Sequence, residues 1–360
     1  MRTPLYSEHV LLGAKMVDFH GWDMPLEYTG ILKEHMAVRM SVGIFDVSHM
    51  GDIKISGKDS ESFVNYLVPT DLSLLRSCHC IYTEFLNDDG LIIDDTIFYR
   101  LSDDEFFFVP NASTTETVLK WIRSKSSNFN VRIENVSDEI ACIAVQGKNS
   151  LDVSKRMNVT FPDVFTFNQS SSDHFNSITG NNDMIISGTG YTGERGFEII
   201  CPSEAAVKVW HDLMDIIHDY DGLPCGLGSR DSLRMEKGML LSGTDFSNNR
   251  DPYECSISFT VSEKGDFIGK KNLMKRKIED REIFRGFVTD TRIIPRGGSR
   301  VFIDGEEIGI VTSGTFSPVI GKSIALGFVL KNRVKIGDGV LINVRGKEIP
   351  ARVSRPKMVP

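Results

Sequence analysis

Two adjacent aspartates, Asp94 and Asp95, lie in the middle of an otherwise apolar stretch over residues 91–99. An ionised carboxylate is costly to bury without a partner, so its presence in such a stretch points to a site that uses charge. The alternation of a strand places Asp95 and Tyr99 on one face and Asp94 on the other. Only one of the two aspartates can therefore share a pocket with Tyr99. The alternative is that both reach solvent at the edge of a sheet.

Glu198 poses the same problem within the apolar segment 196–199. Its carboxylate offers two parallel acceptors, which suit a planar ligand edge with two N–H donors, such as a pterin or a guanine. The alternative is an internal ion pair with an arginine. Arg230 and Arg234 lie about one helical turn apart and either could supply that partner, or could bind a ligand carboxylate through two hydrogen bonds. Spacing alone leaves both interpretations open.

A glycine-rich segment at 188–193 reads Gly-Thr-Gly-Tyr-Thr-Gly and matches the GxGxxG pattern of dinucleotide-binding proteins. That function needs a helix to begin at the glycines, so that its N-terminus can hold the pyrophosphate. Here residues 197–200 read as a strand, and the next helix does not begin before Ser203. We therefore reject a dinucleotide site. The six cysteines form no CxxC pair, so we expect reduced, mostly buried thiols and no metal site.

The elements that must position these residues alternate between helix and strand. Helical periodicity covers 30–39, 60–67, 114–122 and a segment that Ser203 can N-cap. Strand patterns cover 42–47, 52–56, 81–86, 91–99, 105–109, 139–145 and 183–187, with a hairpin turn at 87–90. After residue 283 the pattern changes to five short strands with Gly, Pro or Asp between them: 284–289, 299–303, 307–313, 323–330 and 339–344. The sequence thus predicts an α+β body followed by a small C-terminal β-barrel or sandwich.

The composition fits an ordinary globular protein of two or three domains, with 360 residues, 41% hydrophobic and 25% charged. We see no secretory signal and no apolar run of membrane-spanning length, and we expect a cytoplasmic protein. A net charge of −8 disfavours nucleic-acid binding as the function of the whole chain. Residues 270–360 nevertheless hold 19 Lys and Arg against 9 Asp and Glu. This basic quarter predicts an acidic partner or an anionic ligand, unless it is only a solvated face.

Five motifs together resemble the glycine cleavage T-proteins, a family of tetrahydrofolate-dependent aminomethyltransferases. The motifs occur in the family's order between about residues 5 and 358, at 20–25, 45–51, 190–198, 230–236 and 310–318. The resemblance implies three domains arranged as a cloverleaf around a central folate channel. Its domains would be 1–51 with 138–243, then 52–137 with 244–276, and a C-terminal β-barrel at 277–360.

The resemblance also implies an activity and a partner. In this family an aminomethyl group arrives on the lipoyl arm of H-protein, N5 of tetrahydrofolate attacks its methylene, and ammonia leaves. The products are 5,10-methylenetetrahydrofolate and dihydrolipoyl H-protein. H-proteins are generally acidic, which gives the basic C-terminal quarter a plausible partner. Two alternatives are a folate-dependent demethylase of a small molecule and a folate-binding protein without turnover. The presence of Asp95 disfavours the second.

Residue roles follow from the same resemblance. Asp95 matches the catalytic aspartate near the reacting pterin nitrogens, where it would orient the folate and stabilise developing positive charge. Glu198 matches the carboxylate that binds the pterin edge, and Arg230 an arginine on the folate tail side. Phe259 stands where family members commonly have a tryptophan, and the sequence ends at Pro360, short of a tyrosine-bearing tail, so we expect no contact from that tail. The remaining pocket positions, each of which a core role would also explain, are Met50, Tyr82, Ile97, Tyr99, Asn111 and Tyr191.

Overall fold

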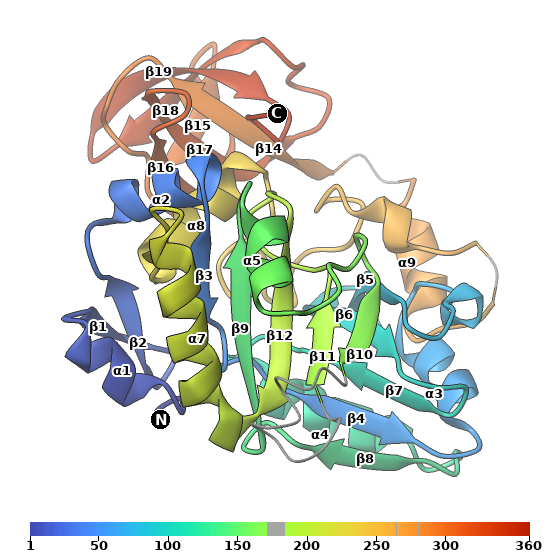
Figure 1. Ribbon diagram of the computed structural model, residues 1–360. Coiled ribbons are helices and arrows are strands. Elements are labelled where there is room, and N and C mark those ends of the chain that lie inside the picture. The colour runs from blue at the N-terminus through green and yellow to red at the C-terminus, as the bar shows by residue number, and fades with distance from the viewer. Residues whose placement is uncertain (171–183, 264, 279–280) are drawn as a thin grey trace. The chain divides into compact units, whose positions relative to one another are not determined.

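A computed structural model describes residues 1–170, 184–263, 265–278 and 281–360 (Figure 1). The chain divides into two compact units, and neither is continuous in sequence. Unit 1 comprises Met1–Leu67, Asp71–Thr83 and Asp95–Arg230. Unit 2 comprises Val68–Thr70, Glu84–Asp94 and Asp231–Pro360. Among the described residues no helix has the length and apolar character needed to cross a membrane.

A six-stranded sheet forms the centre of unit 1. Its strand order is β10 (Phe167–Ser170), β11 (Met184–Ser187), β12 (Gly196–Pro202), β9 (Ile140–Gln146), β3 (Gly43–Asp46) and β13 (Leu223–Pro224). Helices α5 (Ser150–Arg156) and α7 (Ala206–His218) lie over one face (Figure 1). There Val153 of α5 and Trp210 and Leu213 of α7 pack with Ile143 and Ile199 of the strands in one buried core. This apolar face leaves the opposite face available for polar side chains.

The register of the strands decides what that opposite face carries. Ser187 pairs with Glu198, Glu198 with Ala144, and Ala144 with Phe45, across four neighbouring strands. Residues directly opposite each other in antiparallel strands point to the same side of a sheet. None of these four residues belongs to the core under α5 and α7. Glu198 therefore lies in a row on the face away from the helices.

A five-stranded sheet, ordered β5-β6-β7-β4-β8, supplies the aspartates. Strands β5 (Cys80–Leu86) and β6 (Ile92–Arg100) both pass from one unit to the other, and the turn between them belongs to unit 2. The other strands are β7 (Glu105–Phe108), β4 (Ile53–Ser56) and β8 (Arg132–Asn135), with helices α3 (Ser60–Leu67) and α4 (Thr115–Lys125) nearby in the chain. An isolated bridge between His79 and Thr166 joins the two sheets of unit 1 where β5 and β10 begin.

The other elements of unit 1 precede these sheets in the chain or lie between their strands. They are α1 (Tyr6–Leu11), the hairpin β1 (Lys15–Phe19) with β2 (Trp22–Glu27), α2 (Ile31–Met40) and the short 3-10 turns Leu72–Leu74 and Ser203–Ala205. Helix α8 (Leu227–Glu236) crosses from unit 1 into unit 2. Unit 2 adds the 3-10 turn Ser258–Thr260 and helix α9 (Lys270–Arg276).

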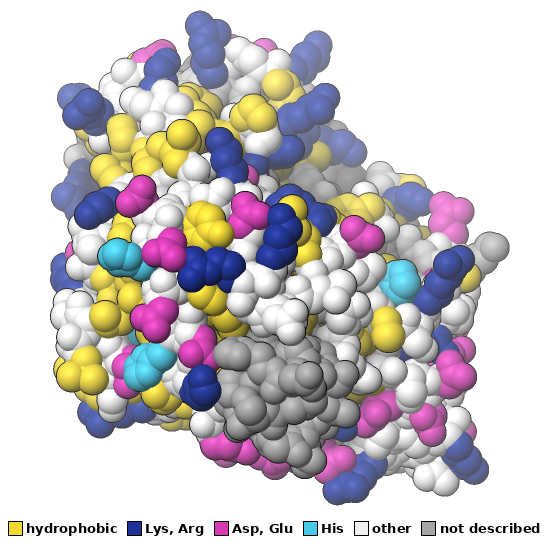
Figure 2. Space-filling model, viewed as in Figure 1, with side chains coloured by type: hydrophobic (Ala, Val, Ile, Leu, Met, Phe, Trp, Pro, Cys, Tyr) yellow, Lys and Arg dark blue, Asp and Glu magenta, His cyan; other side chains and the backbone are white. Residues whose placement is uncertain are grey.

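The C-terminal part of unit 2 is a closed six-stranded barrel. Its order is β14 (Glu282–Thr289), β17 (Lys322–Leu330), β16 (Glu306–Ser317), β15 (Arg300–Ile303), β18 (Gly339–Val344) and β19 (Lys347–Ser354). Phe287, Val311, Val329 and Ile342 lie in its buried interior. Lys and Arg side chains are spread over the face of the barrel that Figure 2 shows. The predicted α+β body and the predicted C-terminal barrel are both confirmed.

Three local features differ from the predictions. Residues 15–27 form the hairpin β1–β2, which was not predicted, and His20 and Gly21 in its turn both have positive φ. A sixth barrel strand, β19, was not predicted. Ser203 does not cap a helix, because its hydroxyl donates to the carbonyl of Asp138 and a 3-10 turn precedes α7.

Candidate functional site

Glu198 is half-buried in the middle of β12 and accepts a hydrogen bond from the hydroxyl of Thr189 at Oε2. Thr189 lies in the loop between β11 and β12. Its oxygen also lies 2.9 Å from the hydroxyl of Ser187 and 3.3 Å from the phenol of Tyr99. Glu198 is therefore held by hydroxyl groups, and no ion pair within 4.0 Å is found for it among the described residues. The alternative of an internal ion pair with Arg230 or Arg234 is thus not realised.

Arg230 lies on α8 and points its guanidinium over the ring of Tyr191, with 4.8 Å between the guanidinium carbon and the ring centroid. Strand β13 pairs in parallel with β3, so the residues that follow both strands leave the sheet at the same end. Met50, which is half-buried, follows β3, and Arg230 follows β13. Burial lowers the pKa of Arg230, and the nearby charge of Glu198 acts in the opposite direction.

Two buried nitrogen atoms near this point lack a hydrogen-bond partner among the described residues. One is Nη1 of Arg230 and the other is Nδ1 of His49. Burial lowers the pKa of His49 to about 4; the charges of Arg230 and His20 lower it further, and Asp46 opposes the shift. His49 is therefore neutral near pH 7. A buried polar atom without a partner is rare in folded proteins and indicates a place where a ligand or water binds.

Asp95 lies on β6 with both carboxylate oxygens engaged. The phenol of Tyr82 donates to Oδ2 at 2.8 Å, and the side-chain amide of Asn111 donates to Oδ1 at 2.8 Å and to the backbone carbonyl at 3.1 Å. Asp95 and Ile97 are half-buried, whereas Asp94 is 0% exposed. The alternative that both aspartates reach solvent is therefore wrong. The structure brings together three of the predicted residues, Asp95, Tyr82 and Asn111.

Tyr99 shares strand β6 with Asp95 and contacts the threonine that binds Glu198. It lies four residues after Asp95 on the same face of β6, at a distance of about 13 Å along the strand. Its side chain is 1% exposed and packs on Phe107 and Phe167, while its hydroxyl contacts Thr189. Burial raises the pKa of Tyr99 well above its usual value, so the phenol stays protonated. One strand of unit 1 therefore carries Asp95 and also reaches the group that binds Glu198.

The glycine-rich segment has a structural explanation that involves Gln146. The side chain of Gln146 accepts from the hydroxyl of Thr192 at 2.8 Å and donates to the carbonyl of Thr189 at 3.2 Å. A Cβ at Gly190 would lie 2.1 Å from Gln146, and one at Gly188 would lie 1.9 Å from the carbonyl of Asp163. The strand β12 follows this loop, as expected. The glycines therefore allow close backbone packing of a loop that carries Thr189 and Tyr191.

Arg234 has a different role from either one predicted for it. It is 1% exposed in unit 2 and pairs with Asp245 at 2.7 Å and with Asp231 at 2.8 Å. Its guanidinium also donates to the hydroxyl of Ser313 on the barrel strand β16. Arg234 therefore ties the second half of α8 to the barrel and is part of the folded core of unit 2.

Phe259 also lies in unit 2, where its side chain is 76% exposed. Its role in a pocket stays a prediction. All six cysteines are free, and five of them are buried. No group of three or more potential metal ligands occurs among the described residues.

Gln146, Thr189 and His49 were not predicted from the sequence. Gln146 directly precedes a glycine at the end of an apolar strand, and an amide at that point was a signal that could have been used. Thr189 falls inside the glycine-rich segment 188–193 and His49 inside the motif at 45–51, but nothing in their spacing reveals which atoms they contact.

Comparison with known proteins identifies the family of the chain. Residues 5–265 match the family model of the GCVT N-terminal domain, and residues 284–359 match that of the glycine cleavage T-protein C-terminal barrel domain. The chain is 42% identical to the aminomethyltransferase of Thermotoga neapolitana over 355 residues, covering 98% of this chain and 96% of the relative. It is 38% identical to that of Staphylococcus epidermidis over 368 residues, covering 99% and 98%.

A solved structure gives the same result. The crystal structure of glycine cleavage system aminomethyltransferase T from Bartonella henselae superimposes with a TM-score of 0.92 at 30% identity, covering 100% of this chain and 98% of that one. The predicted family is confirmed. The two family models together span nearly the whole chain, and so does each of the two relatives. The chain belongs to the glycine cleavage T-protein family of aminomethyltransferases.

Proposed function

We propose that this aminomethyltransferase of the glycine cleavage system uses tetrahydrofolate as acceptor substrate and the aminomethylated lipoyl arm of an H-protein as donor. Two C–N bonds form between the transferred methylene carbon and N5 and N10 of the folate. The C–S bond to the lipoyl arm and the C–N bond to the leaving amine break. The two protons released from N5 and N10 end on the thiol and on ammonia, so the reaction is balanced without an oxidant.

The observation that carries the proposal is the pair of half-buried carboxylates in unit 1, Asp95 and Glu198. Glu198 presents a carboxylate that no described cation neutralises in an ion pair, as recognition of an edge with two N–H donors requires. Nη1 of Arg230 and Nδ1 of His49 lie buried nearby without partners. These groups fit a planar, hydrogen-bonding ligand, for which polar groups on a preformed surface provide orientation.

Asp95 would stabilise the positive charge that develops on the transferred carbon and on the pterin nitrogens. Tyr82 and Asn111 donate one hydrogen bond to each of its oxygens, which fixes the plane of the carboxylate. A carboxylate fixed in this way stabilises a developing charge without reorganising during the reaction. Holding donor and acceptor in line supplies a large further part of the rate.

The proposal of an acidic protein partner rests on the basic quarter of the chain. Several of its cations are already used within unit 2, since Arg276 donates to the carbonyl of Asp89 and Lys277 pairs with Glu263. Arg292 and Arg296 are exposed, and neither forms an ion pair with a described carboxylate. We place the H-protein contact around these two arginines. The three-domain division and the pocket role of Phe259 also remain proposals.

The test is a turnover assay with purified protein, aminomethylated lipoyl H-protein and tetrahydrofolate under anaerobic conditions. We expect methylenetetrahydrofolate and ammonia to form in equal amounts and only when both substrates are present. Product formed from a free N-methylated amine without H-protein would instead identify a demethylase. Tight folate binding with no turnover on either donor would identify a binding protein.

A further inference from the structure

A chain of buried hydroxyl and thiol groups ends on Glu198. The hydroxyl of Thr189 binds Oε2 of Glu198. Its oxygen also lies 2.9 Å from the hydroxyl oxygen of Ser187 and 3.3 Å from that of Tyr99. Behind Ser187 lies the thiol of Cys80, at 3.9 Å from its hydroxyl. Ser187, Tyr99, Cys80 and Thr189 are all buried, and all belong to unit 1.

Counting protons fixes the direction of these hydrogen bonds. A threonine hydroxyl has one proton and two lone pairs, whereas a carboxylate can only accept. The geometry lets Thr189 donate either to Ser187 or to Glu198, and the charged acceptor Glu198 takes the single proton. The phenol of Tyr99 can then donate to the oxygen of Thr189. Tyr99 and Thr189 are thus both directed toward one carboxylate oxygen.

The protonation states of the two outer groups agree with this direction. Burial raises the pKa of Tyr99 well above its usual value and raises that of Cys80 to about 12. Both groups therefore keep their protons at neutral pH and remain donors. Hydrogen bonds that are aligned in a chain polarise one another, which strengthens the last bond to the carboxylate.

We infer that Thr189, supported by Tyr99, is a positioning residue that holds the carboxylate of Glu198 in one orientation for the folate substrate. Oε1 and the second lone pair of Oε2 then remain available for the two donors of a pterin edge. The inference rests on the proposed role of Glu198 in folate binding. It goes beyond that role, because the affinity for folate then also depends on Thr189 and Tyr99, which hold the carboxylate and need not touch the ligand.

The decisive variant is Thr189→Val, which keeps the shape of the side chain and removes the hydroxyl. We expect the dissociation constant for tetrahydrofolate, measured anaerobically by calorimetry, to rise roughly tenfold near pH 7. Thr189→Ser, which restores a hydroxyl, should recover most of the lost affinity.

Thr192→Val is the matched control. Thr192 is a buried threonine of the same loop, but its hydroxyl donates to Gln146 instead of Glu198. Its loss can destabilise the loop without weakening folate binding tenfold. If Thr189→Val does not yield folded protein, Tyr99→Phe carries the same test, because it removes a donor to Thr189. It should then weaken folate binding in the same direction, by less.

A measurement without folate separates the inference from the proposed function. The carboxyl carbon of Glu198 can be observed by NMR at pH 7 in ligand-free protein labelled with ¹³C-glutamate and assigned with Glu198→Gln. We expect its chemical shift to change in Thr189→Val, which loses the hydrogen bond to Oε2, and to stay in place in Thr192→Val. An unchanged chemical shift and an unchanged folate affinity in Thr189→Val would overturn the inference. A chemical shift that depends on Thr189 in a protein that binds no tetrahydrofolate would overturn the proposed function and leave the positioning of Glu198 established.

Discussion

Asp95 is the residue at which charge can be tested separately from shape. Asp95→Asn keeps the size of the side chain and an oxygen that can accept from Tyr82 or Asn111, but removes the negative charge. We expect turnover to fall by about 10²–10³-fold with folding preserved, the range found when one electrostatic contact to a transition state is removed. Turnover at saturating substrates and circular dichroism are the measurements. Near-normal turnover would move the chemistry away from Asp95.

Glu198 is expected to act on binding instead of on the chemical step. Glu198→Gln replaces one acceptor oxygen by an amide donor, which would face a donor of the pterin edge and also lose the bond from Thr189. Calorimetry should show weaker binding of tetrahydrofolate by about 10–100-fold. An unchanged affinity would refute the proposed contact with the pterin.

Asp52 gives a prediction for the dependence of stability on pH. It is buried directly after the motif that contains His49, and burial raises its pKa from 3.8 to about 8. The folded protein therefore holds a proton at pH 7 that the unfolded chain has released. The stabilisation from this site is complete below about pH 4 and is lost as the pH rises toward 8.

Asp52→Asn should remove that loss. We expect the free energy of unfolding of the variant to rise relative to that of the wild type as the pH rises from 4 to 8. At pH 7 the relative gain should be at most about 4 kcal/mol. Urea unfolding at a series of pH values measures the difference. Parallel pH curves for the two proteins would show that Asp52 is ionised in the folded state.

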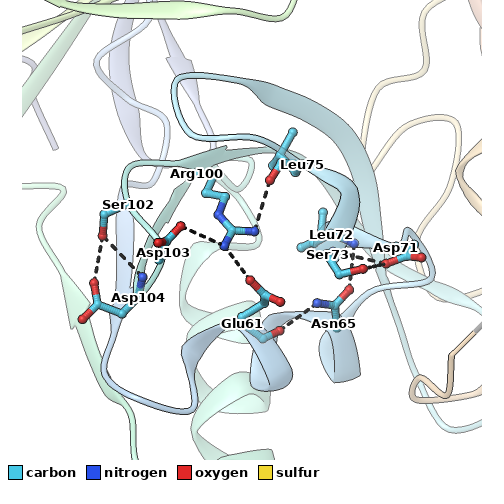
Figure 3. Close-up of polar contacts among 10 residues, drawn as sticks. All are labelled: Glu61, Asn65, Asp71, Leu72, Ser73, Leu75, Arg100, Ser102, Asp103 and Asp104. Carbon is cyan, nitrogen blue, oxygen red and sulfur yellow. Dashed lines mark hydrogen bonds and ion pairs between the residues drawn. The ribbon is translucent and has the colours of Figure 1, made fainter.

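At the scale of elements, strand β6 is anchored at its end by Arg100 (Figure 3). Its guanidinium donates to Glu61 of α3 at 2.5 Å, to Asp103 at 3.3 Å and to the carbonyl of Leu75 at 3.1 Å. Arg100 therefore ties one helix and one loop to the strand that carries Asp95 and Tyr99. It is buried, so these bonds are poorly replaced by water.

Arg100→Met should lower the free energy of unfolding by about 2 kcal/mol, because three acceptors lose a charged donor. Arg132→Met is the control, since Arg132 pairs with Glu134 on the exposed surface of the same sheet. That change should stay within about 0.5 kcal/mol. Equal effects of the two substitutions in urea unfolding would show that Arg100 does not anchor β6.

Much of the element order was predictable because local patterning was strong. The helix at Ser60–Leu67 and the strands around the turn at 87–90 follow directly from periodicity and turn residues. Strand β19 could not be predicted, because Pro350 interrupts its alternating pattern. In the structure Pro350 lies opposite Leu341 of β18, beyond the part of β19 that also pairs with β14, where a missing N–H is tolerated.

The candidate site was predictable in part. The charges of Asp95 and Glu198 are visible in the sequence because each interrupts an apolar strand. The partners of these residues are not, since Tyr82, Asn111 and Thr189 reach them through tertiary pairing of distant segments. The same limit explains Arg234, whose spacing from Arg230 suggested a shared role although the helix directs it to Asp245.

At the scale of the whole molecule, the uneven distribution of charge predicts a salt-sensitive association with an acidic protein. Complementary charges mainly raise the association rate, and salt screens them over about 8–10 Å near physiological ionic strength. We therefore expect turnover at limiting H-protein to fall as ionic strength rises. Arg292→Glu with Arg296→Glu should raise the KM for H-protein severalfold and leave tetrahydrofolate affinity nearly unchanged.

Arg300→Glu with Arg333→Glu is the matched control for that double variant. It changes the net charge equally, but these two barrel arginines already pair with Glu307 and Glu306. A similar rise in KM for both double variants would indicate a general effect of net charge. Kinetics that are independent of salt, together with an unaltered KM, would leave the basic quarter as a solvated surface.

The hairpin tip between β5 and β6 has a consequence for synthesis on the ribosome. Residues 84–94 belong to unit 2, where the backbone of Ile92 pairs with Asn248 and Arg250, and Gly90 lies against Leu273. These partners are translated more than 150 residues after the tip. At about 5–20 residues per second, the tip waits on the order of ten seconds or longer for them. During that interval its apolar strands lack their native cover, which makes the nascent chain a natural client for a chaperone.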